Sequence, residues 1–237
     1  FHKDYYHPAN SYIYLYGDMD MEEKLLWLDK EYLSAYDKKD FTLDSSIALQ
    51  KPFTEPVEKE TTYSVTANEG TEDNTYLSLN TVVGTDTDPI LYVAFQILDY
   101  TLISAPGAPL KQALIDAQIG QDIMGGYENG ILQPYFSVVA KNANKEQKGE
   151  FLSVVKGTLR KLADQGIDKK SLLAGLNYYE FRYREADYGS APKGLMYGLQ
   201  IFDSWLYDDN AAFLLLETQD AMDELYKKAE GSYFEQL

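Results

Sequence analysis

The order of strand-like and helix-like runs constrains the fold of this chain more than any other feature of its sequence. Residues typical of strands mark five short runs, at positions 12–16, 60–67, 75–84, 121–128 and 132–142. Apolar residues at helical spacing predict helices between and after these runs. The elements do not alternate regularly, as a doubly wound parallel sheet would require. The order therefore favours the α+β class, with an antiparallel sheet covered by helices on one face.

Capping residues mark where the predicted helices begin. Asp20 and Asn144 are each followed three residues later by Glu or Gln, which is the spacing of a capping box. Asp88 precedes a proline suited to the first helical turn, and Asp168 can cap a later helix. The predicted helices lie near residues 20–36, 88–98, 109–117, 144–165, 168–188, 195–207 and 218–229.

Turn residues suggest which strands pair. The runs at 60–67 and 75–84 are separated by the polar turn at 68–74, so they look like an antiparallel pair. A second pair, 121–128 with 132–142, is joined through Asn129-Gly130, a strong hairpin signal. The glycines around Gly125 lack the G-x-x-x-x-G-K pattern of a phosphate-binding loop, so a hairpin is the favoured interpretation.

The composition excludes several classes of partner. With 38 acidic against 21 basic residues, the formal net charge is -17, so the surface repels the backbones of nucleic acids. The absence of cysteine removes disulfides and thiolate ligands and suits a reducing compartment, which gives cytoplasm as the expected localisation. No apolar run approaches the roughly 20 residues of a spanning helix, so we expect no membrane partner.

Few residues qualify as candidates for catalysis or metal binding. His2 and His7, with Asp4 between them, have the chemistry of half a zinc site, but we interpret them as ordinary residues of a segment entering a strand. No serine lies in a G-x-S-x-G turn. Two acidic clusters lie in turn-like stretches without the spacing of a calcium loop, which favours solvated surface: Glu55, Glu58, Glu60 and Glu69, Glu72, Asp73.

The 21 tyrosines suggest a face that binds peptides or glycans. Their spacing gives a plainer interpretation. Tyr12, Tyr14 and Tyr16 recur at strand period, while Tyr178, Tyr179 and Tyr183 lie near helix period, so packing is the favoured role for most of them. The predicted list of catalytic, cofactor-binding and metal-binding residues in this chain is therefore empty.

Three stretches carry a resemblance to a known family. Tyr6-His7-Pro8 and Asn10-Ser11, before Tyr12-Ile13-Tyr14-Leu15-Tyr16-Gly17-Asp18, resemble the closing segment of the first domain in insulinase-type zinc metallopeptidases, especially of the presequence-protease subgroup. Residues 98–120, with Ala108-Pro109-Leu110 and Ile119-Gly120, are similar to the second-domain pattern of the family. Residues 184–195 resemble the passage into the helical linker between the two halves of the enzyme.

The resemblance implies a two-halved enclosure in which short unfolded peptides are cut at a zinc site. The family's zinc motif is H-x-x-E-H, and this sequence does not contain it. We therefore expect the piece to begin after the zinc motif, with zinc bound by the parent and no cofactor in this fragment. The N-terminus, which lacks an initiating methionine, likewise favours a cut inside a longer chain.

The expected domain organisation follows from the resemblance. Residues 1–51 would close the preceding zinc domain, 52–190 would form the second, noncatalytic peptidase-homology domain, and 191–237 would start the helical linker. The fragment alone would be inactive, with the remaining domains of the parent as its partners and unfolded peptide as the parent's substrate. Two alternatives stay open: an acidic, tyrosine-rich peptide- or glycan-binding domain, and a peptidase homologue that has lost its zinc.

Overall fold

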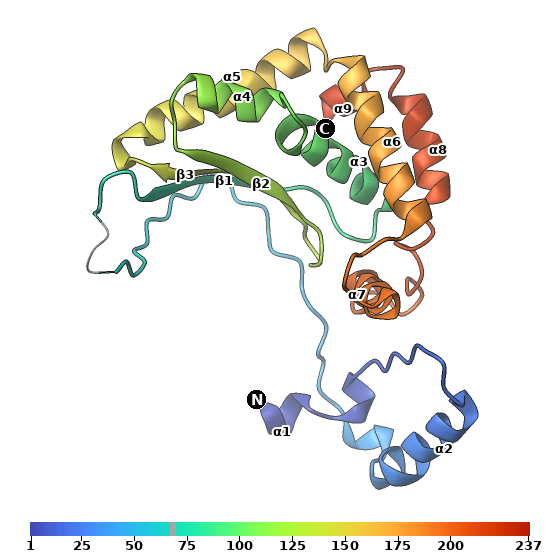
Figure 1. Cartoon of the computed structure of the whole chain (residues 1–237). Helices are drawn as coiled ribbons and strands as arrows, with labels where there is room; N and C mark the ends of the chain where they lie inside the picture. The colour runs from blue at the N-terminus through green and yellow to red at the C-terminus, as the bar shows by residue number, and fades with distance from the viewer. Residues whose placement is uncertain (67–69) are drawn as a thin grey trace. The chain divides into compact units, whose positions relative to one another are not determined.

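The computed structural model of the chain describes residues 1–66 and 70–237. These residues form two compact units, each assembled from segments that are distant in sequence (Figure 1). Unit 1 comprises Phe1–Leu49 and Asp187–Leu216, and unit 2 comprises Gln50–Ala186 and Glu217–Leu237. The chain leaves and re-enters each unit, so both depend on contacts between segments far apart along the chain.

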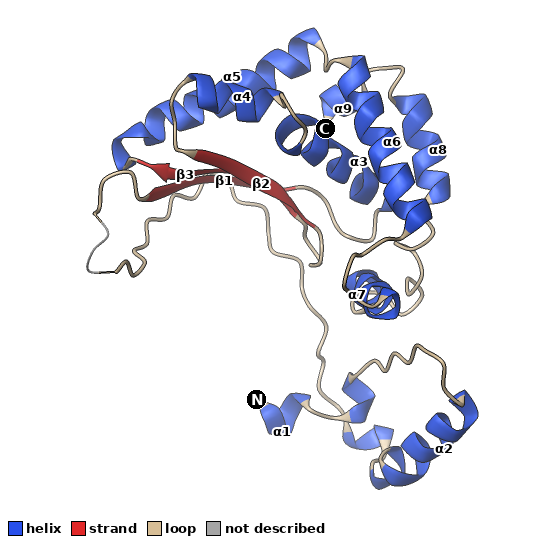
Figure 2. Cartoon of the chain, viewed as in Figure 1, coloured by secondary structure: helices blue, strands red, loops and turns tan. Residues whose placement is uncertain are grey.

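Unit 2 contains a three-stranded antiparallel sheet, shown in red in Figure 2. Its strands lie in the spatial order β1-β3-β2 and are β1 (Thr75–Val82), β2 (Asp122–Glu128) and β3 (Tyr135–Ala143). In the central strand, Val138 lies opposite Leu79 of β1 and Gly125 of β2. The predicted strands at 75–84, 121–128 and 132–142 are confirmed, and the last two pair as predicted.

The helices of unit 2 cover one face of this sheet (Figure 1). In chain order they are α3 (Pro89–Asp99), the π-helical turn η4 (Tyr100–Ser104), α4 (Pro109–Asp116), η5 (Lys145–Gln147), α5 (Lys148–Gln165), α6 (Lys169–Glu185), α8 (Gln219–Lys228) and α9 (Tyr233–Gln236). Their apolar faces meet in a core whose largest fully buried side chains include Phe151, Ile97, Leu110, Leu114, Leu172, Leu176, Met222 and Leu225. The predicted α+β class, with an antiparallel sheet covered by helices on one face, is confirmed.

The four predicted capping residues all begin helices. Asp88 accepts two backbone N–H groups of α3, at 3.0 Å each. Asp20 and Asp168 each accept one backbone N–H of the helix that follows, at 2.9 and 2.8 Å. Asn144 forms a reciprocal capping box at the start of η5. Because these bonds satisfy donors that a helix leaves unpaired, they help to set where these four helices start.

Unit 1 combines short helices from the first part of the chain with one longer helix from its last third. They are α1 (His2–Tyr5), η1 (Pro8–Asn10), α2 (Met21–Glu31), η2 (Leu33–Ala35), η3 (Lys38–Asp40) and α7 (Lys193–Trp205). The structure describes α2 in full, and none of its residues is buried. By contrast, α7 buries Gly194, Gly198, Ile201 and Ser204, which share one face of the helix.

The predicted strand at residues 12–16 is wrong. In the described part of the chain these residues form no strand, and the side chains of Tyr12, Tyr14 and Tyr16 pack on α7 instead. Alternation of large side chains is typical of extended backbone. A sheet additionally needs a neighbouring strand to share its N–H and C=O groups, and alternation carries no information about such a partner.

The predicted strand at residues 60–67 is also wrong over its described part, residues 60–66, which form no strand. The partner of β1 is β3 rather than this segment. Side chains hold the segment beside the start of β1: the Tyr63 ring lies 5.6 Å from that of Tyr76, and its hydroxyl donates to Oδ1 of Asn74 at 2.7 Å. Residue 67 and turn residues 68 and 69 lie outside the described residues.

Candidate functional site

The two histidines take part in local packing of the N-terminal segment. His2 stacks on Tyr6 with ring centroids 4.2 Å apart, and Nδ1 of His7 accepts the backbone N–H of Ala9 at 3.0 Å. Over residues 1–66 and 70–237, no group of three or more His, Cys, Asp or Glu residues is placed to hold a metal ion. The structure thus brings no zinc ligands together there, and the empty list of site residues stays a prediction.

The glycine-rich stretch at residues 125–130 belongs to a strand and the turn after it. Gly125 lies in β2 so close to the carbonyl of Ser137 in β3 that a Cβ atom would overlap this oxygen. The hydroxyl of Ser137 donates to the carbonyl of Gly126 at 3.4 Å. The hairpin interpretation is confirmed, because β2 and β3 pair antiparallel on either side of the turn.

The acidic clusters lie on the surface. Glu58 forms an ion pair with Lys148, the first residue of α5, and Glu60 forms one with Lys145 of η5 at 2.6 Å. The hydrogen bond and charge of Lys145 hold the pKa of Glu60 below its usual range. These pairs attach an irregular segment to a helix, and nothing in them indicates acid-base chemistry. Glu69 lies outside the described residues.

The most distinctive feature of unit 1 is a contact between the predicted strand and α7, which we name the tyrosine seam: Tyr12, Tyr14, Tyr16, Gly194, Gly198 and Trp205. Alternate residues of an extended segment are about 6.6 Å apart, and residues four apart on a helix about 6 Å. This match lets Tyr16 and Tyr14 meet successive turns of α7, whereas Tyr12 meets Trp205, seven residues beyond Gly198. Tyr16 lies on Gly194, Tyr14 on Gly198, and Tyr12 on Trp205 with ring centroids 4.5 Å apart.

Glycine is required at both positions where a tyrosine ring lies against the backbone of α7. A Cβ on Gly198 would approach a ring carbon of Tyr14 to 2.7 Å, and a Cβ on Gly194 would overlap the ring of Tyr16 outright. Beyond the end of α7, the hydroxyl of Tyr12 donates to Oδ1 of Asp209 at 2.5 Å. This hydrogen bond, with burial and the nearby carboxylates, raises the pKa of Tyr12 to about 12. The seam is therefore both packed and anchored.

A cavity of about 390 Å³ opens within unit 2, and its walls are mainly apolar. They come from the end of β1, from α3 and η4, from β3, and from α5 and α9; the apolar side chains include Val83, Phe95, Leu98, Leu102, Phe136, Leu159, Leu162, Ile167 and Phe234. Two charged side chains, Arg160 and Glu235, share this lining. Apolar walls with a few polar groups are typical of small-molecule sites.

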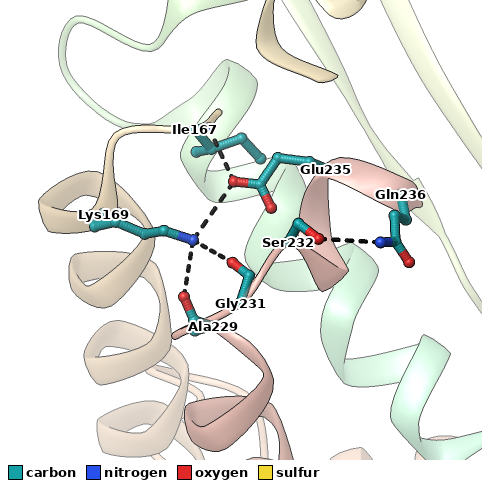
Figure 3. A network of polar contacts seen from close by, with 7 residues as sticks. All are labelled: Ile167, Lys169, Ala229, Gly231, Ser232, Glu235 and Gln236. Carbon is teal, nitrogen blue, oxygen red and sulfur yellow. Dashed lines mark hydrogen bonds and ion pairs between the residues drawn. The ribbon is translucent and has the colours of Figure 1, made fainter. Parts of the chain in front are cut away.

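Glu235 belongs to a polar network that joins α9 to the loop between α5 and α6 (Figure 3). One carboxylate oxygen accepts the backbone N–H of Ile167 at 3.0 Å and lies 3.5 Å from Nζ of Lys169. Lys169 also donates to the carbonyls of Ala229 and Gly231. Although burial raises the pKa of Glu235, these bonds and the charge of Lys169 hold it below its usual range. The carboxylate is therefore ionised at neutral pH.

Sequence reasoning missed both the tyrosine seam and the cavity. The alternation of tyrosines was recognised, but its partner was taken to be a strand. The signal that could have corrected this is the pair Gly194 and Gly198, which leaves one face of the helix without side chains at two successive turns. For the cavity no sequence signal exists, because three helices, α6, α7 and α8, separate Arg160 from Glu235 along the chain.

Comparison with known families identifies the class of this chain as a peptidase-homology domain. Residues 1–178 match the family model described as the Peptidase M16 inactive domain. The chain therefore belongs to the M16, or insulinase-type, family of zinc peptidases, and its relatives show it to be presequence-protease-like. The resemblance inferred from the motifs is confirmed.

Two curated relatives illustrate the match. The protein HypA of Clostridium perfringens is 43% identical over 237 residues, covering 100% of this chain and 24% of that protein. Presequence protease 1, chloroplastic/mitochondrial, of Arabidopsis thaliana is 32% identical over 210 residues, covering 88% of this chain and 19% of that protein. The chain thus spans about a quarter or less of the length of these relatives.

Solved structures support the fold. The crystal structure of a candidate zinc protease from Bordetella pertussis Tohama I superposes with a TM-score of 0.51 at 15% sequence identity, covering 65% of this chain and 84% of that one. The inactive peptidase domain of a candidate zinc protease from Bordetella parapertussis gives a TM-score of 0.50 at 14% identity. At this level of identity the likeness concerns architecture alone.

Proposed function

We propose that this chain is a noncatalytic internal part of a zinc metalloendopeptidase that degrades short unfolded peptides within an enclosed chamber. The observation that carries the proposal is the match of residues 1–178 to a peptidase domain described as inactive, in a sequence with two histidines and no H-x-x-E-H. The role of the chain would be architectural. It would wall the chamber, and a shaped enclosure excludes folded proteins sterically without sequence-specific contacts.

The proposed division of the chain is 1–51 as the end of the zinc domain, 52–190 as the second domain, and 191–237 as the start of the linker. Support for the first two divisions comes from the unit boundaries, which fall after Leu49 and after Ala186. The tyrosine seam then has a function: it would fasten the end of the zinc domain to the first helix of the linker. Residues 217–237 add α8 and α9 to unit 2.

The proposed partners are the remaining domains of the parent. Leu25, Leu26 and Trp27 on α2 expose 55%, 63% and 58% of their surface. Adjacent apolar side chains left in water are typical of a surface that another part of a protein covers. We propose that the zinc domain covers them, while zinc and peptide substrate bind elsewhere in the parent.

The test compares the parent with this fragment. The longer protein containing this sequence is expected to cleave a quenched fluorogenic peptide of about 15–25 residues, and a zinc chelator is expected to abolish the cleavage. The 237-residue chain alone is expected to cleave nothing. Cleavage by the purified fragment would refute the noncatalytic role. A parent that is inactive even with added zinc would instead favour the zinc-less homologue.

Membrane association and localisation remain predictions. The stretch Pro89–Asp116 is long and apolar enough to cross a membrane by composition, but half of it is buried inside the domain, as the core helices of many proteins are. Relatives are described as mitochondrial or chloroplastic in eukaryotes, while the relative from Clostridium perfringens is bacterial. Cytoplasm stays the expected localisation, and fractionation of cells that express the parent would test it.

A further inference from the structure

The face of α7 beside the tyrosine seam carries an exposed apolar row. Leu195, Leu199, Phe202 and Leu206 follow one another at intervals of four, three and four residues. The three leucines expose 55%, 52% and 52% of their surface, and Phe202 is half-buried. We name these four residues the leucine row. Its spacing is that of a heptad seam, which is the pattern that one helix presents to another.

The leucine row and the tyrosine seam lie on adjacent faces of α7. Gly194 and Gly198, which the tyrosine rings cover, precede Leu195 and Leu199 by one residue each. Successive residues of an α-helix point about 100° apart around its axis, so the row lies next to the seam and does not take part in it. The helix is therefore packed on one face and open on an apolar neighbouring face, which a folded protein ordinarily buries.

A carboxylate flanks the leucine row. Asp203 lies four residues after Leu199 and three before Leu206, so it adjoins both on the helix surface. Within the described chain its carboxylate makes no ion pair or hydrogen bond, and burial raises its pKa to about 6. In heptad seams, charged residues beside the apolar positions pair with charges on the facing helix. Asp203 therefore suits a lysine or arginine on such a helix.

A second copy of the chain fits this surface poorly. The row spans eleven residue steps of about 1.5 Å, or about 17 Å, and so short a helix contact buries much less than the roughly 800 Å² per partner of a standard interface. The formal net charge of -17 also makes two copies repel each other. A helix of the same polypeptide needs less area, because tethering raises its effective concentration.

The relatives are long enough to supply such a helix. This chain spans 24% of the protein HypA of Clostridium perfringens and 19% of presequence protease 1 of Arabidopsis thaliana. Most of the length of each relative therefore lies outside the matched region. A parent of comparable length would have many helices available to cover the leucine row.

We propose that the leucine row docks a helix from the part of the parent that lies outside this chain, and that this helix presents apolar residues at heptad spacing with a lysine or arginine opposite Asp203. The inference rests on the proposed membership of a longer protein, but not on the peptidase activity of that protein. It adds to the architectural role a specific joint, in which α7 is held by the tyrosines on one face and by the docked helix on the next.

Cysteine labelling tests whether the row is covered in the parent. The chain contains no cysteine, so Leu199→Cys introduces one thiol, and peptide mass spectrometry follows its reaction with a maleimide. Labelling is expected to be about tenfold slower in the parent than in the 237-residue chain, because it then requires local opening. Leu206→Cys repeats the test at the other end of the row. Lys193→Cys, exposed and on the side of α7 away from the row, is the matched control.

Two outcomes of the labelling would overturn the proposal. Equal, fast rates at position 199 in the parent and in the 237-residue chain would show that nothing covers the row. Equal, slow rates would show that the chain covers the row itself. Slow labelling at positions 199 and 206 of the parent alone, with fast labelling at position 193 in both proteins, supports the docked helix.

Charge reversal tests the basic residue that faces Asp203. In the parent, Asp203→Lys is expected to speed the labelling of Leu199→Cys about fivefold, because like charges would then meet. In the 237-residue chain it should leave the rate unchanged. Asp223→Lys, exposed on α8, controls for the change in net charge. An Asp203→Lys parent that labels no faster than the Asp223→Lys parent would contradict the pairing.

Cross-linking identifies the occupant of the row. A photoreactive group attached to the thiol of Leu199→Cys in the parent is expected to react with a segment outside this chain that has apolar residues at heptad spacing. A cross-link between two copies of the parent, or one to unit 2 of the same copy, would overturn the assignment. Peptide cleavage is measured in none of these arms, so failure here leaves the proposed peptidase untouched, and an inactive parent leaves the docking test intact.

Discussion

Unit 2 and unit 1 are held together by different kinds of contact. In unit 2 the helices and the sheet enclose large aliphatic and aromatic side chains. Of the twelve largest fully buried side chains among the described residues, eleven belong to unit 2, and the other, Leu215, belongs to unit 1. In unit 1 aromatic rings lie on glycines and on one another, and Tyr16 remains 55% exposed. Unit 2 thus has a core of its own, whereas unit 1 depends on its seam.

This difference has consequences for local stability. Burial of apolar surface is the main source of folding free energy, and elements with few buried contacts open at lower cost than the core. Unit 1 is therefore expected to exchange its amide hydrogens through local opening, while the core strands and helices of unit 2 exchange only near global unfolding. Single substitutions in the two units test this contrast.

Removing a core side chain of unit 2 is expected to have the largest effect. Phe151 on α5 is 1% exposed, so Phe151→Ala leaves a cavity and should lower the free energy of unfolding by about 3–5 kcal/mol. Denaturant titration followed by circular dichroism measures the change. Leu159→Ala, on the same helix but 36% exposed, is the control and should cost clearly less. Equal costs would contradict a core centred on this helix.

Adding a methyl group to the tyrosine seam should be the next largest effect. In Gly194→Ala the new Cβ overlaps the ring of Tyr16, and the rearrangement is expected to cost about 1–3 kcal/mol. Faster hydrogen exchange confined to residues 11–18 and to α7 would identify the seam as the element that opens. Gly157→Ala on α5 is the control: no atom lies within 4 Å of its Cβ position, so helix propensity should stabilise it by up to about 1 kcal/mol.

Each unit also contains one partly buried aspartate whose effect on stability depends on pH. Burial raises the pKa of Asp203 in α7 to about 6, and it raises that of Asp99 in α3 to about 6 despite a bond from Ser104. Between the unfolded value near 3.8 and this folded value, the folded state binds more protons. The contribution of each carboxyl is therefore complete below pH 4 and is lost as pH rises through 6.

The measurement is the free energy of unfolding at pH 4.5 and pH 7. Asp99→Asn and Asp203→Asn should each remove a pH-dependent loss on the order of 1 kcal/mol, because the amide stays neutral throughout. Asp223→Asn, on the exposed face of α8, serves as the control and should leave the slope unchanged. A steeper loss of stability with rising pH in either of the first two variants would contradict the sign.

Local and nonlocal information explain what the sequence could predict. Asp88, Asn144 and Asp168 were identified as helix starts because a cap is a bond between residues two or three apart. The pairing of β1 with β3 joins Leu79 to Val138, and no local pattern encodes that distance. The prediction of a strand at residues 12–16 failed for the same reason. The alternation of tyrosines indicates extended backbone, but it does not encode that α7, nearly two hundred residues away, is the partner of this segment.

The smallest expected effect tests the anchor at the end of the tyrosine seam. Tyr12→Phe keeps the ring on Trp205 but removes the bond from the hydroxyl to Asp209, which is 2.5 Å long and exposed to solvent. Water replaces much of that bond, so the loss should be only about 0.5–1 kcal/mol. Tyr14→Phe is the control, because within the described chain the hydroxyl of Tyr14 makes no hydrogen bond.

Denaturant unfolding and hydrogen exchange of residues 11–18 measure the result. If packing alone holds unit 1, Tyr12→Phe and Tyr14→Phe should be indistinguishable in stability and in hydrogen exchange of residues 11–18. If the anchor contributes, Tyr12→Phe alone should speed that exchange, and the difference should disappear in Asp209→Asn, where the bond is already weakened. Non-additivity between positions 12 and 209 would therefore show that the seam is fastened as well as packed.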